Sequence, residues 1–209
     1  MKYSGGPPRT PEDSDPEAPL LALRVYPGGN NESDRSLMLR ARAGDAHARQ
    51  QLLAGISEPV YRYTLRMLSN AEDARDASQD TLVKVLRHLD SYDLDRPFLT
   101  WVFGIARNTC IDEYRRRKRR AWDEPGDVVD PGPPALHLAM QSEDAERLNR
   151  SLAALSPLYR EVIVLYHFEH LKYTEIADVL EVPLGTVMNR IFRARQKLKD
   201  HYENEGGEP

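Results

Sequence analysis

The sequence predicts an all-α protein made of two small helical domains joined by a flexible linker. Apolar residues recur every three to four positions through most of the chain, which is typical of helices that bury one face. A stretch rich in proline and glycine, residues 121–142, interrupts this pattern and divides the chain. Near the C-terminus, residues 171–200 are predicted to form two helices joined by a tight turn, a helix-turn-helix.

The composition limits the class of protein. The chain has 209 residues, of which 40% are hydrophobic and 30% charged, as in soluble helix-rich domains. No apolar run approaches the roughly 20 residues that a membrane span needs, and the N-terminus lacks the apolar core of a signal peptide. The single cysteine, Cys110, excludes an internal disulfide and a cysteine-built zinc site. We therefore expect a cytoplasmic protein without membrane insertion.

The N-terminal part begins with a tail and continues as short helices. Residues 1–33 contain repeated prolines and glycine pairs, which predict a disordered tail. A helix is expected to start near Arg35, capped by Ser33 or Asp34, and to end at Gly44. Asp45 is the predicted cap of the next helix, whose pattern continues over residues 46–53 and 60–68.

Residues 73–89 carry two faces of different character. One face is apolar, with Ala74, Ala77, Thr81, Val85 and Leu89 at helical spacing. The other carries acids. Aspartates in a first turn suit the helix dipole and need no partner, but Asp80 with Gln79 lies one turn further in and indicates a partner surface.

A polar loop, residues 90–97, precedes one long helix predicted over residues 98–120. This helix ends in an unbroken basic run, residues 115–120, which follows Trp101, Phe103 and Tyr114. Cations beside aromatic rings are suited to holding a backbone and stacking on unpaired bases. Core packing and DNA contact are equally consistent with Trp101 and Tyr114. The first domain is predicted to span residues 34–120.

The second domain, residues 143–202, ends in the helix-turn-helix. Its penultimate helix buries Ile176, Ala177 and Leu180, and its last helix buries one face and exposes a basic one. Before it, helices are predicted over residues 143–155 and from Pro157, the latter burying Leu158, Val162, Leu165 and Tyr166. The buried face of the last helix consists of Val187, Ile191, Ala194 and Leu198, and its exposed face of Asn189, Arg190, Arg193, Arg195 and Lys197. Residues 203–209 are predicted to be a frayed acidic tail.

Two blocks of sequence resemble a known family. The segment LSPLYREVIVLYHFEHLKYTEIADVLEVPLGTVMNRIFRARQKL resembles region four of extracytoplasmic-function (ECF, group IV) sigma factors of the sigma-70 family. AEDARDASQDTLVKVLRHL, followed by RPFLTWVFGIARNTCIDEYRRRKRR, resembles region two. The two blocks occur in the family's order, are separated by a linker and lack region three, so the resemblance is more specific than a lone helix-turn-helix.

The resemblance implies a promoter-specificity subunit, not an enzyme, that needs neither a cofactor nor a metal. Region two would bind the β′ clamp helices of core RNA polymerase and capture a flipped base of the melted −10 element in the loop at residues 91–97; region four would bind the β flap and the duplex −35 element. An anti-sigma factor is the expected regulator, and the free protein is expected to be monomeric. The implied polymerase-binding residues are Asp73, Asp76, Gln79, Asp80 and Lys84. The implied −10 contacts are Trp101, Asn108, Asp112, Arg115 and Arg116. The implied −35 contacts are Thr186, Met188, Asn189, Arg190, Phe192, Arg193 and Arg195.

The chain departs from the family pattern at three places. Met188 and Asn189 stand where members usually carry a basic residue and then serine. Asparagine can pair with adenine and methionine can contact a thymine methyl, so the upstream element is expected to differ from the common one. Glu181 stands where the turn usually has glycine, and positive φ costs a non-glycine residue about 1–2 kcal/mol, so a turn of different shape is expected. The third departure is the proline-rich N-terminal tail.

Two other readings stay open at this stage. A stand-alone helix-turn-helix regulator would bind duplex DNA unaided, but the formal net charge of −4 and the basic, aromatic-bearing helix of the first domain disfavour it. A protein-interaction adaptor would not need the basic run at residues 115–120. Among metal ligands, His167 and His170 are one helical turn apart but have no third partner nearby in the sequence.

Overall fold

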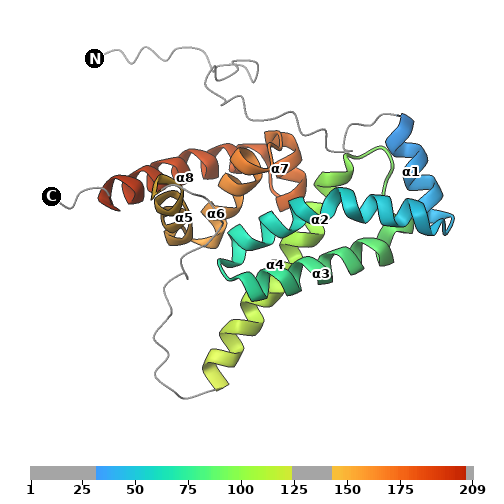
Figure 1. The fold of residues 1–209 in the computed structure, drawn as a ribbon. Coiled ribbons are helices and arrows are strands. Elements are labelled where there is room, and N and C mark those ends of the chain that lie inside the picture. Colours follow the sequence, from blue (N-terminus) through green and yellow to red (C-terminus); the bar gives the residue numbers. More distant parts are fainter. Residues whose placement is uncertain (1–31, 124–142, 206–209) are drawn as a thin grey trace, which may run out of the picture.

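The structure, a computed structural model, describes residues 32–123 and 143–205, and all of its regular elements are helical. Most of the predicted N-terminal tail and linker, and the last four residues, lie outside the described residues. Among the described helices, none is long and apolar enough to cross a membrane. Figure 1 shows the helices in chain order.

The first unit consists of four α-helices and one 3₁₀ turn. They are α1 (Glu32–Arg42), α2 (Ala46–Leu68), α3 (Ala71–His88), η1 (Leu89–Ser91) and α4 (Phe98–Asp123). The predicted cap at Asp45 is confirmed, since its carboxylate accepts hydrogen bonds from the N–H groups of the first turn of α2. Asn70 caps α3 in the same way, so α3 begins two residues before the predicted start.

Other boundaries in this unit also differ from expectation. α1 begins at Glu32, so the predicted caps Ser33 and Asp34 lie inside its first turn. α2 is one continuous helix that accommodates Pro59 in its interior, where the proline is buried. α4 extends to Asp123, three residues into the predicted linker. The apolar stripe predicted on α3 is confirmed: Ala74, Ala77, Thr81, Val85 and Leu89 are all buried.

The second unit consists of four α-helices and one π-type turn. They are α5 (Glu143–Ala154), α6 (Pro157–Ile163), η2 (Val164–Phe168), α7 (Tyr173–Leu180) and α8 (Leu184–Glu205). The predicted face of α8 packs inward: Val187, Ile191 and Ala194 are buried and Leu198 is partly buried. Leu158 was wrongly predicted to be buried. It is 41% exposed because it lies in the first turn of α6, outside the core, next to the start of α8.

The turn between α7 and α8 has a left-handed residue at Glu181, although the sequence predicted a different turn shape there. Glu181 has φ 54° and ψ 43°, and its N–H donates to the carbonyl of Ala177 at the end of α7. The expected change of turn shape is therefore absent. The packing of α7 against α8 fixes the chain direction here, and a glutamate occupies a position that favours glycine.

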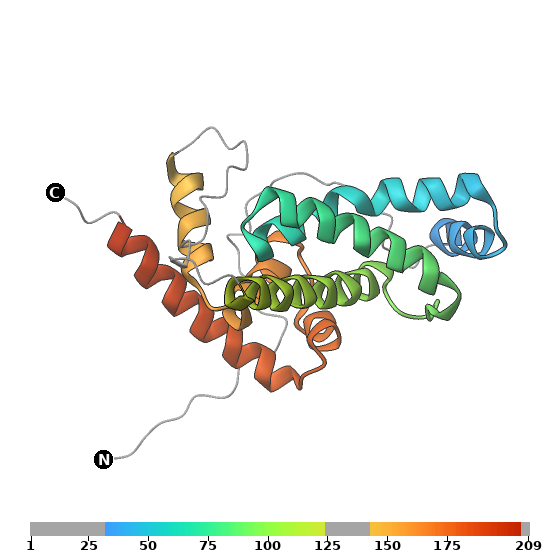
Figure 2. The same cartoon turned by 90° about the horizontal axis from the view of Figure 1, so that it is seen from below.

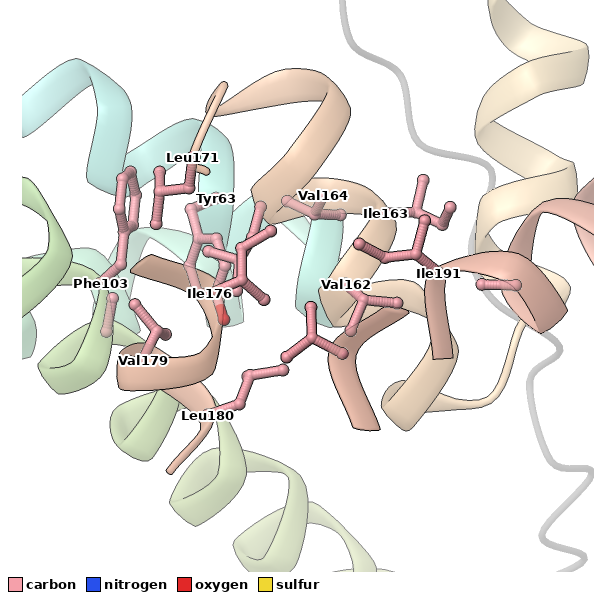
Figure 3. Packing of buried hydrophobic residues seen from close by; sticks show 14 of the residues in the cluster. Tyr63, Phe103, Val162, Ile163, Val164, Leu171, Ile176, Val179, Leu180 and Ile191 are labelled. Carbon is pink, nitrogen blue, oxygen red and sulfur yellow. The ribbon is translucent and has the colours of Figure 1, made fainter. Parts of the chain in front are cut away.

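The two units are packed against each other through a shared hydrophobic core. α4 lies between α2 and α3 on one side and α7 on the other (Figures 1 and 2). Tyr63 of α2 and Phe103 of α4 lie in one buried cluster with Ile176, Val179 and Leu180 of α7 (Figure 3). In this conformation, the loosely tethered arrangement expected from the linker is not observed. The apolar face of α4 is wider than its own unit can cover, and α7 buries the rest.

Candidate polymerase and nucleic-acid interfaces

The outer face of α3 is polar and accessible. Asp76, Gln79 and Asp80 are exposed, because the small residues on the opposite face hold α3 against α2 and α4. Asp73, also on the predicted polymerase-binding face, is half-buried, and its carboxylate lies 4.0 Å from the Arg117 guanidinium of α4. Three of the five predicted residues thus form one open acidic surface.

Lys84, the last of these predicted residues, is oriented differently. Its ammonium group donates a 3.0 Å hydrogen bond to the Thr109 hydroxyl of α4, so it joins two helices of the same unit. Val83, which the sequence analysis did not single out, is 45% exposed instead. It follows Asp76, Gln79 and Asp80 at helical spacing on their face. The sequence could have predicted this exposure, because Val83 is separated by one residue from the predicted buried stripe of α3.

The predicted −10 residues of α4 lie along one side of the helix. Trp101, Asn108 and Asp112 are spaced at i, i+7 and i+11, which places them on a common face. Asn108 and Asp112 are exposed. Trp101 is half-buried, and its ring packs on Tyr92 and Phe98 at centroid distances of 5.0 and 5.8 Å. It therefore both supports the loop at residues 91–97 and exposes part of its ring, whereas Phe103 is core.

The loop at residues 91–97 is fixed in shape by internal and neighbouring contacts. The Asp95 N–H donates to the Asp93 carboxylate at 3.0 Å, and the Tyr92 hydroxyl donates to the Arg96 carbonyl. Arg42 of α1 donates to the Tyr92 carbonyl from the other side. The Asp93 carboxylate is thus engaged within the loop, whereas the Asp95 carboxylate pairs with Arg35 of α1 at 3.3 Å.

The basic run is partly neutralised by neighbouring acids. Arg115 is 3.8 Å from Asp112, and Arg116 is 2.7 Å from Glu113, a carboxylate that is itself buried. Both arginines remain more than half exposed. In Figure 1 the last turns of α4 project beyond the other helices. Arg115 and Arg116 are accessible to a polyanion, which would compete with these intrahelical ion pairs.

Helix α8, the second helix of the helix-turn-helix and the predicted recognition helix, presents an apolar ridge beside polar side chains. Leu184, Met188 and Phe192 follow each other at i, i+4 and i+8 and are 41, 51 and 66% exposed. Asn189 and Arg193 are exposed next to this ridge. They also line a polar pocket of about 270 Å³ between the start of α8 and α6. A contiguous exposed apolar ridge of this kind is typical of an interaction site.

The remaining predicted −35 residues are engaged within the protein. The Arg190 guanidinium is 3.4 Å from the Glu161 carboxylate of α6, and its side chain is only 20% exposed. The Arg195 guanidinium donates to the His167 ring at 3.4 Å and lies over the Tyr166 ring. Thr186 is half-buried in the first turn of α8. Met188, Asn189, Phe192, Arg193 and Arg195 are therefore the exposed members of the set.

No group of three or more histidine, cysteine, aspartate or glutamate side chains within the described ranges is arranged to hold a metal ion. Cys110 is buried, and burial raises the pKa of its thiol to about 12, so it is protonated and unreactive in this conformation.

Known proteins share both units. Residues 56–120 match the family model of sigma-70 region 2, and residues 145–198 match that of sigma-70 region 4. The RNA polymerase sigma-H factor of Pseudomonas aeruginosa is 31% identical over 178 residues, covering 80% of this chain and 92% of that protein. The ECF RNA polymerase sigma factor SigM of Mycobacterium tuberculosis is 31% identical over 172 residues, covering 82% and 86%.

Solved structures of sigma factors resemble this chain as well. The sigma factor RpoE, crystallised with the anti-sigma factor NepR from Bartonella quintana, superposes with a TM-score of 0.66 at 28% identity, covering 74% of this chain and 96% of that one. CnrH, in complex with the cytosolic domain of CnrY, gives a TM-score of 0.64 at 29% identity, covering 83% and 99%. The matched regions and relatives together identify this chain as a member of the ECF RNA polymerase sigma factors.

Proposed function

We propose that this sigma factor binds core RNA polymerase in the cytoplasm and selects start sites by reading two promoter elements with its two units. The observation that supports this most directly is the distribution of surfaces. An acidic face on α3, an exposed polar face on α4 and an exposed recognition face on α8 lie on separate helices. Sigma factors direct an enzyme and are not enzymes themselves.

The acidic face of α3 is the proposed contact with the β′ clamp helices. Asp76, Gln79 and Asp80 supply charged and polar groups, and Val83 adds an apolar centre that is 45% exposed. An apolar anchor surrounded by charges is typical of a binding hot spot. Asp73 and Lys84 support this face from its edges through Arg117 and Thr109.

The exposed side of α4 is the proposed site for the melted −10 element. Asn108 and Asp112 offer an amide and a carboxylate that can pair with the Watson–Crick edge of a flipped base, and the partly exposed Trp101 ring lies on the same side. Arg115 and Arg116 follow on the same helix and can hold the phosphates.

The recognition helix is the proposed site for the duplex −35 element. Asn189 can pair bidentately with adenine, Met188 can contact a thymine methyl, and Arg193 can reach guanine or phosphate. Phe192 adds apolar contact, while Thr186, Arg190 and Arg195 flank these residues. The β flap would be bound by the rest of this unit.

An anti-sigma factor is the proposed regulator, and the free chain is proposed to be monomeric. The structures of RpoE and CnrH, which resemble this fold and are 28 and 29% identical to the matched parts of this chain, are of complexes with NepR and with the cytosolic domain of CnrY. A chain of the same architecture is expected to offer such an inhibitor the same kind of surface.

In-vitro transcription with purified core polymerase on a promoter library tests the proposal. The chain is expected to direct initiation from a subset of promoters that share upstream and melted elements. Without polymerase, it is expected to bind the same duplexes poorly at physiological salt. A tight footprint that needs no polymerase, with no effect on initiation, would instead support a stand-alone helix-turn-helix regulator.

A further inference from the structure

An apolar groove lies on the surface of the first unit, and no described residue fills it. It lies where α2 and α3 are side by side (Figures 1 and 2), has a volume of about 490 Å³ and is open to solvent. Its lining residues are Ala46, Arg49, Gln50, Leu53, Ala54 and Ser57 of α2 and Leu82 of α3. A groove of this size can take several side chains of a partner segment.

Small side chains create the groove. Ala46, Ala54 and Ser57 are too short to cover the space between the two helices. Leu53 and Leu82, which pack on the edge of the core of the first unit, therefore remain only partly buried. Contiguous apolar surface that is left open in this way is typical of an interaction site.

The groove adjoins the acidic face of α3 that is proposed to bind polymerase. Leu82, which forms the α3 wall of the groove, follows Gln79 of that face by one helical turn. Its neighbour Val83 is the apolar residue of the same face and is 45% exposed. A segment that lies in the groove therefore covers part of the polymerase-binding face.

The sequence contains one segment that matches the groove in chemistry. Residues 20–25, LLALRV, are the only apolar run among the 31 residues that precede α1. Pro19 and Pro27 flank this run, and the residues around it are mostly prolines, glycines and acids. Four branched apolar side chains within six residues gain free energy when they leave water for an apolar surface.

The connection is long enough for this segment to reach the groove of its own chain. Six residues separate Val25 from Glu32, the first residue of α1, and a connection of this length spans up to about 25 Å. Glu32 lies about 12 Å along α1 from Arg40. The Arg40 carbonyl accepts a hydrogen bond from the Asp45 N–H, directly before Ala46 at one end of the groove.

The charges of the segment and of the groove are complementary. Arg24, inside the apolar run, is the only cation between residues 10 and 31, and the acidic face of α3 borders the groove. Residues 12–17, before the run, carry four acids, and Arg49 is exposed among the lining residues of the groove. A segment seated in the groove can therefore pair its charges on both sides.

We propose that residues 20–25 dock in the groove between α2 and α3 of the same chain, and that this docking competes with core polymerase for the adjoining face of α3. Docking removes the leucines from water and brings Arg24 close to the acids of α3. The competition rests on the proposed function, because it requires polymerase to bind α3. The docking itself concerns the free chain alone.

Disulfide trapping in the full-length chain tests the docking. Ala22→Cys with Ala54→Cys places one thiol in the segment and one in the groove. Ala22→Cys with Ala43→Cys is the matched control, because Ala43 is an exposed alanine at a similar distance along the chain but outside the groove lining. Oxidised glutathione is expected to link the groove pair about tenfold faster than the control pair, since docking raises the effective concentration above that of a free tether.

The natural cysteine does not interfere with this measurement. Burial raises the pKa of the Cys110 thiol to about 12, so it stays protonated and does not compete for the cross-link.

A second variant removes the apolar character of the segment. Leu21→Asp with Leu23→Asp is expected to slow trapping of the groove pair to the rate of the control pair. Without added cysteines, the same change is expected to increase the affinity for core polymerase about three- to tenfold, the factor by which a mostly docked population reduces the competent fraction. Ser4→Asp with Thr10→Asp adds the same charge outside the run and is expected to change neither property.

A variant on the groove side checks the same competition. Ala54→Gln places a longer polar side chain at an exposed helical position and is expected to raise polymerase affinity as the segment variant does.

Equal trapping rates for the groove pair and the control pair would overturn the docking. Cross-linked dimers in place of an internal cross-link would assign the groove to a second copy and overturn it as well. Selective trapping without a gain in polymerase affinity for Leu21→Asp with Leu23→Asp would overturn the competition. A chain that traps as expected while all its variants fail to bind polymerase would refute the proposed function and leave the docking in place.

Discussion

Arg66 of α2 and Glu169, which follows η2, form an ion pair of 3.5 Å between the two units, with their side chains 10% and 2% exposed. The guanidinium also lies over the Phe168 ring, 4.2 Å from its centroid. Glu169 is thus enclosed by the first unit although it belongs to the second. A charged pair at such depth makes the stability of the packed molecule depend on pH.

Stability is expected to rise on mild acidification because of Glu169. Burial raises the pKa of its carboxyl to about 7; Arg66 and Arg62 lower it, and Glu58 raises it further. A carboxyl whose pKa is higher in the folded protein takes up a proton on folding. The stabilisation of the folded state by this proton uptake is complete below the ordinary pKa of 4.5 and is lost as the pH rises to about 7.

Urea denaturation at a series of pH values between 5 and 8 checks this prediction. The titration of Glu169 changes the free energy of unfolding by at most about 1.4 kcal/mol per pH unit. Glu169→Gln is expected to flatten the profile, although Glu161, whose pKa is also raised by burial, retains part of the slope. Identical profiles for wild type and Glu169→Gln would contradict the assignment.

Glu181→Gly is expected to stabilise the helix-turn-helix. Glu181 is held at φ 54°, where a side chain is disfavoured and glycine is not. The free energy of unfolding should increase by about 1 kcal/mol. Thermal denaturation of the two proteins measures the difference. A loss of stability would show that the Glu181 side chain makes a compensating contact.

Substitutions of the adjacent residues Val83 and Lys84 are expected to affect different properties, polymerase binding in one case and folding stability in the other. Val83→Ala should weaken binding to core polymerase by about 1 kcal/mol and leave folding unchanged, since Val83 is exposed. Lys84→Ala should cost about 1 kcal/mol of folding stability through the lost bond to Thr109. Titration of labelled polymerase and urea denaturation separate the two effects. Equal polymerase affinities for wild type and Val83→Ala would remove Val83 from the interface.

Asn189→Ala and Arg116→Ala are expected to change promoter use in different ways. Asn189 is exposed on the recognition helix, and its loss should relax the choice at one upstream base pair by about 1–3 kcal/mol. Arg116→Ala should weaken holoenzyme binding at all promoters and reduce the salt dependence of that binding. Holoenzyme binding to a set of promoters at several salt concentrations measures both. If both variants affected all promoters equally, direct base reading by Asn189 would be excluded.

Met188 is expected to read a thymine methyl group. Its side chain is 51% exposed on the ridge of α8. Replacing the contacted thymine by deoxyuridine removes only the methyl group. This change should weaken DNA binding by the wild-type holoenzyme by about 0.8 kcal/mol, roughly fourfold. Met188→Ala should bind both templates equally. A variant that still distinguishes them would assign the contact to a neighbour such as Phe192.

The sequence alone determined most of the helices, the cap of α2 and the resemblance to the family. Asp45 begins α2 because its side chain accepts the free N–H groups of the first turn, a local effect, whereas Asn70 caps α3 in the same way without having been predicted. The stripe on α3 and the inward face of α8 follow from helical periodicity, which the order of residues fixes by itself. The exposure of Asn189 follows from the same periodicity, whereas Asn108 was named only through the family resemblance.

Only the tertiary structure decided how the two units meet and which polar residues are engaged. Arg107 pairs with Glu161 across 54 positions of sequence, and Arg66 with Glu169 across 103. No local pattern encodes such pairs, because they depend on α7 covering the apolar side of α4 that its own unit leaves open. Arg190, which the sequence placed among the DNA contacts, pairs with Glu161 of α6, another helix of its own unit that lies 29 positions away in the sequence.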